Sequence, residues 1–287
     1  MERLKISHIS IVIVSLKIFL ISVILIKYLP EASEKDLLFD QTFYWFLLAG
    51  FLAQIVDGAL GMAYGVTSNS ILLGFGLSPK LASTAVHTAE VFTTGVSGLS
   101  HMRFGNFDKK LFIKLIIPGV ISSSIGAYLL GDVVDGKTIK PFINAYLIVL
   151  GIIILSKAFK RNVNTKANLK SASLYALFGG FLDAIGGGGW GPIVTSNLIK
   201  QGNTPSIIIG TVNTAEFFVT FFSAGILIYF TGIQSWQIIL GLIIGGTIAA
   251  PLGAFVTKKV PRKAMTIAVG ILIIITSLFS LYKVFFL

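Results

Sequence analysis

The sequence predicts an all-α polytopic membrane protein, built from two inverted-topology repeats with broken or short helices and an extra N-terminal helix. Three observations lead to this fold class. Apolar residues make up 54% of the 287 residues and charged residues only 12%, against about 25% charged residues in a soluble domain. Apolar stretches recur along the whole chain, and several approach the roughly 20 residues that a helix needs to cross a bilayer. Two long segments also repeat each other in order.

Residues 1–40 are expected to form an N-terminal transmembrane helix followed by an acidic outside loop. The chain starts with basic residues, and its apolar run is longer than that of a signal peptide, so we expect an uncleaved helix. Lys17 lies inside this run. Its ammonium group therefore needs a protein neighbour, or must extend to the membrane interface.

The two repeats are expected at residues 41–160 and 171–287, joined by a basic cytoplasmic linker at 161–170. The segment "GFLAQIVDGALGMAYGVTSN" (Gly50–Asn69) pairs with "GFLDAIGGGGWGPIVTSN" (Gly180–Asn197) after a gap of two residues. Further on, "AVHTAEVFTT" pairs with "TVNTAEFFVT" 126 positions later. The two halves are therefore predicted to share one fold.

The basic residues predict the orientation of the chain. Lys and Arg gather at Arg103–Lys114, Lys157–Lys170 and Lys258–Lys263, and such clusters beside apolar spans are typical of cytoplasmic loops. This places the N-terminus inside, the C-terminus outside, and the two repeats in opposite orientations, a plan common among secondary transporters. Membrane insertion also accounts for the net charge of +11, so no nucleic-acid partner is expected.

Both repeats contain a segment that is interrupted by glycine or proline. In the second repeat four glycines precede "PIVTSNLIK", which would be only about 13 Å long as a helix. Short, broken segments at matching positions indicate a transporter binding site, although the glycines could instead serve close packing. The predicted substrate-binding residues in and around these segments are Ser68, Asn69, Gly187, Gly188, Trp190, Ser196, Asn197 and Asn213.

Each "TAE" motif places a glutamate within an apolar span. A carboxylate at the bilayer centre costs on the order of 3 kcal/mol, so such residues usually face the protein interior and have a function. Polar residues three positions before and four after each glutamate share its helical face. The predicted coupling stripe comprises Asp57, His87, Glu90, Thr94, Asp183, Glu216 and Thr220. The glutamates could instead clamp helices together, and His87 could relay protons or remain a neutral hydrogen-bonding residue.

Other chemistries lack their sequence signatures. The chain contains no nucleotide-binding glycine motif and no H-E-x-x-H motif, so no enzyme, cofactor or metal site is predicted. It has no cysteine, which excludes disulfide and thiol chemistry.

The doubled pattern resembles the TauE/SafE family of sulfite and organosulfonate exporters. It is carried by "GFLAQIVDGALGMAYGVTSN" with "STAVHTAEVFTTGVSGLSH", and by "GFLDAIGGGGWGPIVTSN" with "GTVNTAEFFVT". The resemblance implies export of a small sulfur-containing anion, such as sulfite or sulfoacetate, across the cytoplasmic membrane. The expected partners are this anion and the lipid bilayer, with a homodimer left open.

The residues themselves fit an anion bound by helix N-termini and neutral donors, without Lys or Arg. We expect alternating access, with Glu90 or Glu216 carrying a coupled proton. The alternative is a proton/cation antiporter in which Asp57, Glu90, Asp183 and Glu216 bind the ion directly.

Overall fold

The computed structural model describes residues 6–28, 39–60, 62–159, 171–201, 204–234, 236–259 and 262–286, and these contain helices and no strand. In chain order the elements are α1 (Ile6–Tyr28), α2 (Gln41–Leu60), α3 (Tyr64–Gly74), α4 (Pro79–Arg103), α5 (Lys109–Tyr128), the π-helical turn η3 (Leu129–Val133), α6 (Gly136–Lys157), α7 (Ala172–Gly186), the π-helical turn η4 (Gly191–Thr195), α8 (Ser196–Lys200), α9 (Pro205–Thr231), α10 (Trp236–Lys259) and α11 (Arg262–Phe286). The all-α prediction is confirmed. The predicted linker at 161–170 and most of the acidic loop lie outside the described residues.

Five helices of the described chain are long and apolar enough to cross a membrane: α1, α5 with η3, α6, α9 and α11. Large apolar side chains cover the outside of the bundle; Ile26 is 76% exposed and Phe142 71% exposed. In water such a surface would drive aggregation, whereas lipid solvates it. The molecule is a multi-pass membrane protein.

Side-chain caps fix the starts of three helices. Ser78 accepts a hydrogen bond from the Leu81 backbone at the start of α4, where Pro79 takes the first helical position. Asp108 caps α5 in the same way, and Asp135 caps α6. These three long helices therefore begin at residues that supply their own caps.

The first helix of each half packs against the fourth helix of the other half. In one pair α2 runs parallel to α10, with Gly241 beside Phe43 and Gly245 beside Leu47. In the other pair α7 runs parallel to α5, with Gly180 against the backbone of Gly119. Glycine at these contacts lets the backbones approach closely.

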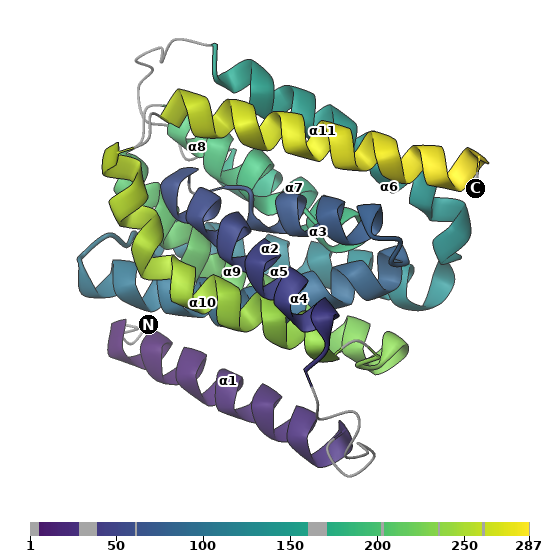
Figure 1. Ribbon diagram of the computed structural model, residues 1–287. Coiled ribbons are helices and arrows are strands. Elements are labelled where there is room, and N and C mark those ends of the chain that lie inside the picture. The colour runs from purple at the N-terminus through teal and green to yellow at the C-terminus, as the bar shows by residue number, and fades with distance from the viewer. Residues whose placement is uncertain are drawn as a thin grey trace.

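Helices at matching places in the two halves run antiparallel to each other. Along α4 and α9, Gly95 lies beside Phe217 and Gly98 beside Thr214, so the chain directions oppose. The helices α6 and α11 pair in the same antiparallel sense and lie together at the top of Figure 1. Antiparallel pairing of matching helices is the arrangement that an inverted repeat requires.

Helix α1 lies at the edge of the bundle, outside both halves (Figure 1). It contacts α4, and Ile13 and Leu20 are its buried anchors. The ammonium group of Lys17 donates a hydrogen bond of 3.0 Å to the carbonyl of Phe92 in α4. Lys17 therefore has the protein neighbour that its place in an apolar helix requires.

Candidate functional site

Two chain reversals meet in the middle of the bundle. One, which we call the first tip, comprises residues 62–65 at the start of α3. The other, the second tip, joins α7 to η4 at residues 187–190. A Cβ atom added at Gly188 would come within 2.5 Å of the Val66 backbone, and one at Gly65 would lie 3.5 Å from the Gly188 Cα. The tips are thus in direct backbone contact, and only residues without a side chain fit between them.

The second tip is held by the opposite half of the protein. Gly187 adopts the left-handed conformation (φ 66°) that ends α7. The side-chain amide of Asn69 donates a 2.7 Å hydrogen bond to the carbonyl of Gly186, and the Tyr146 hydroxyl donates one of 2.8 Å to the carbonyl of Gly188. The glycine run is therefore a built loop, with partners from α3 and α6.

An aspartate satisfies backbone N–H groups in each tip. Asp183 Oδ1 accepts hydrogen bonds from the N–H groups of Gly189 (2.7 Å) and Trp190 (3.0 Å). Asp57 Oδ1 accepts one from the N–H of Tyr64 at 3.3 Å. Each aspartate lies seven residues before the tip residue that it caps, and the two pairs are 126 positions apart. The hydrogen bonds therefore give Asp57 and Asp183 equivalent roles, although an alignment of the two halves on their "VTSN" motifs does not pair these aspartates.

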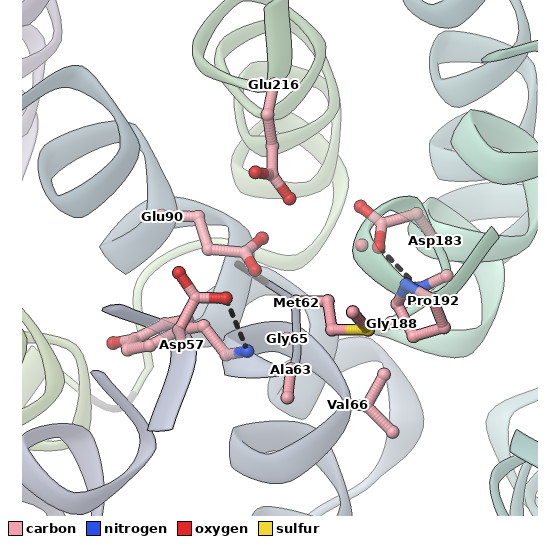
Figure 2. A pocket seen from close by; sticks show the side chains of 13 residues that line it. Asp57, Met62, Ala63, Gly65, Val66, Glu90, Asp183, Gly188, Pro192 and Glu216 are labelled. Atoms are coloured by element: carbon pink, nitrogen blue, oxygen red, sulfur yellow. Dashed lines mark hydrogen bonds between the residues drawn. The ribbon is translucent and has the colours of Figure 1, made fainter. Parts of the chain in front are cut away.

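The two glutamates approach the tips from the antiparallel helices α4 and α9. Figure 2 shows the carboxylates of Asp57, Glu90, Asp183 and Glu216 directed into one space, each from a different helix. Glu90 Oε1 lies so close to Gly65 that a Cβ there would be 2.8 Å from it. Glu90 is buried, whereas Glu216 remains partly exposed.

The carboxylates line two adjoining cavities. The first, drawn in Figure 2, lies between the tips and has room for about one water molecule. Its wall consists of Asp57, Met62, Ala63, Tyr64, Gly65, Val66, Glu90, Asp183, Gly188, Gly189, Gly191, Pro192 and Glu216. The second is of similar size, lies along α4 and α9 and is lined by Gln54, Asp57, Tyr64, Glu90, Thr93, Thr94, Ser97, Asn213 and Glu216. Among the described residues, both walls carry acidic side chains and contain no Lys or Arg.

His87 lies behind the first cavity. Its Nδ1 is 2.8 Å from the backbone carbonyl of Ser83, and its Nε2 is 3.3 Å from Asp183 Oδ2. Together with Glu90 these residues offer three ligand atoms within 4.8 Å of one another, the one such trio found in the described chain. This cluster joins α4 of the first half to α7 of the second.

The structure brings together some of the predicted residues and separates others. Asp57, Glu90, Asp183, Gly188 and Glu216 line the first cavity, and Thr94 and Asn213 line the second. Asn213 donates a 2.8 Å hydrogen bond to Ser97. The remaining predicted residues do not line either cavity: Ser68, Asn69, His87, Gly187, Trp190, Ser196, Asn197 and Thr220.

Trp190, Asn197 and Thr220, which line neither cavity, form hydrogen bonds close to the site. The Trp190 ring is fully buried, and its N–H points to the carbonyl of Val212. Asn197 donates to Ile193 within its own segment. Thr94 and Thr220 donate to the backbone carbonyls of Glu90 and Glu216, respectively, so they repeat each other's role.

The "VTSN" motifs leave polar atoms without partners. Thr67 Oγ1, Ser68 Oγ and Asn69 Oδ1 of the first motif, and Thr195 Oγ1 of the second, are buried and make no hydrogen bond within the described chain. Buried hydroxyl groups of this kind need an explanation, because most are hydrogen-bonded in folded proteins.

Sequence reasoning missed Tyr64, Gly189 and Ser97. Tyr64 follows Asp57 by seven residues, as Trp190 follows Asp183, and Gly189 precedes Trp190; the shared spacing is visible once the aspartates are aligned with an offset of 126. Ser97 carries no such signal, because its partner Asn213 lies 116 residues away.

Comparison with known proteins shows which family this chain resembles. The model of the family described as sulfite exporter TauE/SafE matches residues 46–280. The chain is also 40% identical over 241 residues to "Probable membrane transporter protein YtnM" of Bacillus subtilis (strain 168), covering 81% of this chain and 80% of that protein. No solved structure matches the chain.

Proposed function

Because the chain belongs to the sulfite exporter TauE/SafE family, which consists of membrane transporters rather than enzymes, we propose that it exports a small sulfur-containing anion. The substrate class would be sulfite, sulfoacetate or a similar sulfonate. The observation that carries the proposal is the meeting of two interrupted segments, one from each half, around a single cavity. Interrupted helices that meet in this way are a common binding-site design in secondary transporters.

The tips are suited to oxyanions, because helix N-termini attract negative charge. In this structure three N–H groups of the tips are bonded to Asp57 and Asp183. Carboxylate oxygens therefore stand where we expected substrate oxygens. The unpartnered hydroxyl groups of Thr67 and Ser68 remain as donors that an anion could satisfy after a small movement of the tips.

Four carboxylates around one cavity would repel an anion unless their charge is reduced. We propose that Glu216 carries a coupled proton. A proton carrier must be reached by water from at least one side, and Glu216 is partly exposed whereas Glu90 is buried. Protonation of Glu216 would then lower the negative charge of both cavities, because it lines both.

The antiparallel pairing of matching helices supports alternating access. In this proposal the two tips are exposed in turn to opposite sides of the membrane, with the N-terminus inside and the C-terminus outside. The proposed units are the two halves, residues 41–160 and 171–287, and α1 stands outside both.

A second candidate is a proton/cation antiporter. It is favoured by the absence of Lys and Arg from the walls of both cavities, which suits a cation better than an anion. In this case Asp57, Glu90, Asp183 and Glu216 would bind the ion directly, and the chemical nature of external anions would not affect transport.

Transport in proteoliposomes tests these alternatives. Labelled sulfite and a small labelled sulfonate are offered with and without an imposed pH gradient. We expect saturable uptake that the gradient accelerates, and we expect Glu216→Gln to abolish the acceleration. Asp132→Asn, which removes an exposed carboxylate outside both cavities, is the matched control. Uptake of neither anion by folded protein would overturn the anion proposal, and an unchanged pH response in Glu216→Gln would overturn the proton role.

A further inference from the structure

The trio of His87, Glu90 and Asp183 lies where two helices of different halves meet. His87 and Glu90 are three residues apart on one face of α4, and Asp183 faces them from α7. The sequence motifs predict no metal site, because the third ligand comes from the other half of the chain. Folding alone brings the three together.

The hydrogen bond of His87 determines which of its nitrogens is free. Nδ1 lies 2.8 Å from the backbone carbonyl of Ser83, and a carbonyl can only accept, so we assign the ring proton to Nδ1. In the neutral ring Nε2 then presents a lone pair, 3.3 Å from Asp183 Oδ2. A positive charge between these two atoms removes their repulsion: either a second ring proton, which makes the contact an ion pair, or a bound metal ion.

Apart from the contact between His87 and Asp183, the three ligand atoms have no partner among the residues that the structure describes. His87 Nε2, Glu90 Oε2 and Asp183 Oδ2 are buried without a hydrogen bond, in residues that are 0%, 2% and 3% exposed. The other oxygen of Asp183 is fixed by two backbone N–H groups, which turns Oδ2 toward His87. Leaving even one such group unpaired costs about 1–3 kcal/mol, and more for a charged group.

We propose that His87, Glu90 and Asp183 bind a divalent cation of the first transition row. Imidazole nitrogen with carboxylate oxygen suits such ions, whereas Mg²⁺ and Ca²⁺ prefer oxygen alone. A histidine whose other ring nitrogen donates to a backbone carbonyl is the usual arrangement around a bound metal. The carbonyl of Ser83 provides that second contact.

The spacing of the ligand atoms can be compared with what one ion needs. Zn²⁺ lies about 2.0–2.2 Å from nitrogen and oxygen ligands, so two ligands of one tetrahedral ion are about 3.3–3.6 Å apart. The His87–Asp183 separation of 3.3 Å falls in this range. The widest separation in the trio, up to 4.8 Å, requires the cluster to contract by about 1.2 Å when the ion binds.

Three protein ligands leave a coordination position open. Glu90 and Asp183 also line the first cavity, so a bound ion would stand at its wall. If the proposed function holds, the ion supplies the positive charge that a cavity with four carboxylates otherwise lacks, and an oxygen of the exported anion completes its coordination. The second half lacks this site, because Asn213 takes the place of His87 and bonds to Ser97.

Metal binding is measured on the full chain in detergent, purified through a tag without histidine and stripped with a chelator. Zn²⁺ is titrated calorimetrically, and Co²⁺ is followed by its visible absorption. We expect one ion per chain. His87→Asn introduces the residue that the second half has at the matching position, Asn213. We expect this variant to bind the ion 10-fold to 100-fold more weakly, or more weakly still. Glu90→Gln should weaken it as well, whereas His101→Asn, which lies outside the trio, should bind normally.

Two outcomes would overturn the site: no binding of either ion by the wild-type protein, or equal binding by wild-type and His87→Asn. The measurement does not depend on transport. An ion bound at the trio without anion uptake would contradict the proposed function alone, and anion uptake by protein that binds no metal would contradict the site alone.

Discussion

The second tip is anchored more firmly than the first. Asp183 accepts two backbone hydrogen bonds of 2.7 and 3.0 Å, and Asn69 and Tyr146 hold the same loop from the opposite half. In the first tip Asp57 accepts a longer bond of 3.3 Å from Tyr64, and the Tyr64 hydroxyl donates one of 3.2 Å to the carbonyl of Leu242 in the opposite half. Because these bonds are longer than those of the second tip, we expect the first tip to move more during transport.

The backbone conformation also differs between the two tips, and again the first tip is the less stable one. Ala63 in the first tip has φ 148°, a value that side-chain-bearing residues rarely adopt. The residue 126 positions later, Gly189, does not adopt a positive φ, so this strain is confined to the first tip. Strain of this kind costs on the order of 1–3 kcal/mol and is often retained at sites that change conformation.

The largest expected effect on stability comes from a substitution at Gly187 in the second tip. In Gly187→Ala a Cβ would meet the side chain of Asn69 and occupy a left-handed conformation. We expect a loss of about 3 kcal/mol of unfolding free energy, from the backbone penalty and the overlap together. Reversible unfolding in mixed micelles measures it.

Two glycines provide controls for this variant. Gly76→Ala adds a side chain at φ 101° with open space around it, so it isolates the backbone penalty. Gly225→Ala adds one in open space within α9 and should be neutral or slightly stabilising. A Gly187→Ala protein as stable as Gly225→Ala would contradict the account of the second tip.

The next effect compares the two aspartates directly. Asp183→Ala removes the acceptor of two short backbone hydrogen bonds, whereas Asp57→Ala removes the acceptor of the longer Tyr64 bond. We expect losses of about 2–3 kcal/mol and about 1 kcal/mol, respectively. Unfolding of both variants under the same conditions checks the difference, and equal losses would mean that the tips are anchored alike.

The smallest effect should be a gain. Ala63→Gly relieves the strain in the first tip, so we expect the protein to become about 1 kcal/mol more stable. If Ala63→Gly destabilises the protein, as glycine does in an ordinary helix, then the conformation of the first tip is not strained.

Much of the fold could be predicted from the sequence. Apolar length identifies α1, α5, α6, α9 and α11, and the repeated "TAE" motif locates Glu90 and Glu216 because both copies lie on regular helices. The short, interrupted segments were also foreseen, since glycine runs and Pro192 do not continue a long helix.

The site itself depends on contacts that sequence patterns do not encode. The contact between His87 and Asp183 spans 96 residues and exists only because α4 packs against α7. The equivalence of Asp57 and Asp183 was hidden because the second half has extra residues between its aspartate and its "VTSN" motif. The π-helical turn η4 begins in that stretch. Such a turn widens the helix to take in additional residues.

The most direct test of the central claim is whether the cavity between the tips opens to both sides of the membrane. The chain contains no cysteine, so Met62→Cys in the first cavity and Ser97→Cys in the second can be labelled cleanly in sealed vesicles. An impermeant maleimide is applied from one side or the other, with Ser100→Cys, an exposed position near the end of α4, as control. We predict that Met62→Cys and Ser97→Cys react from either side, that sulfite slows both reactions, and that Ser100→Cys reacts from one side only. Labelling of the cavity positions from a single side, unaffected by sulfite, would contradict alternating access between the two tips.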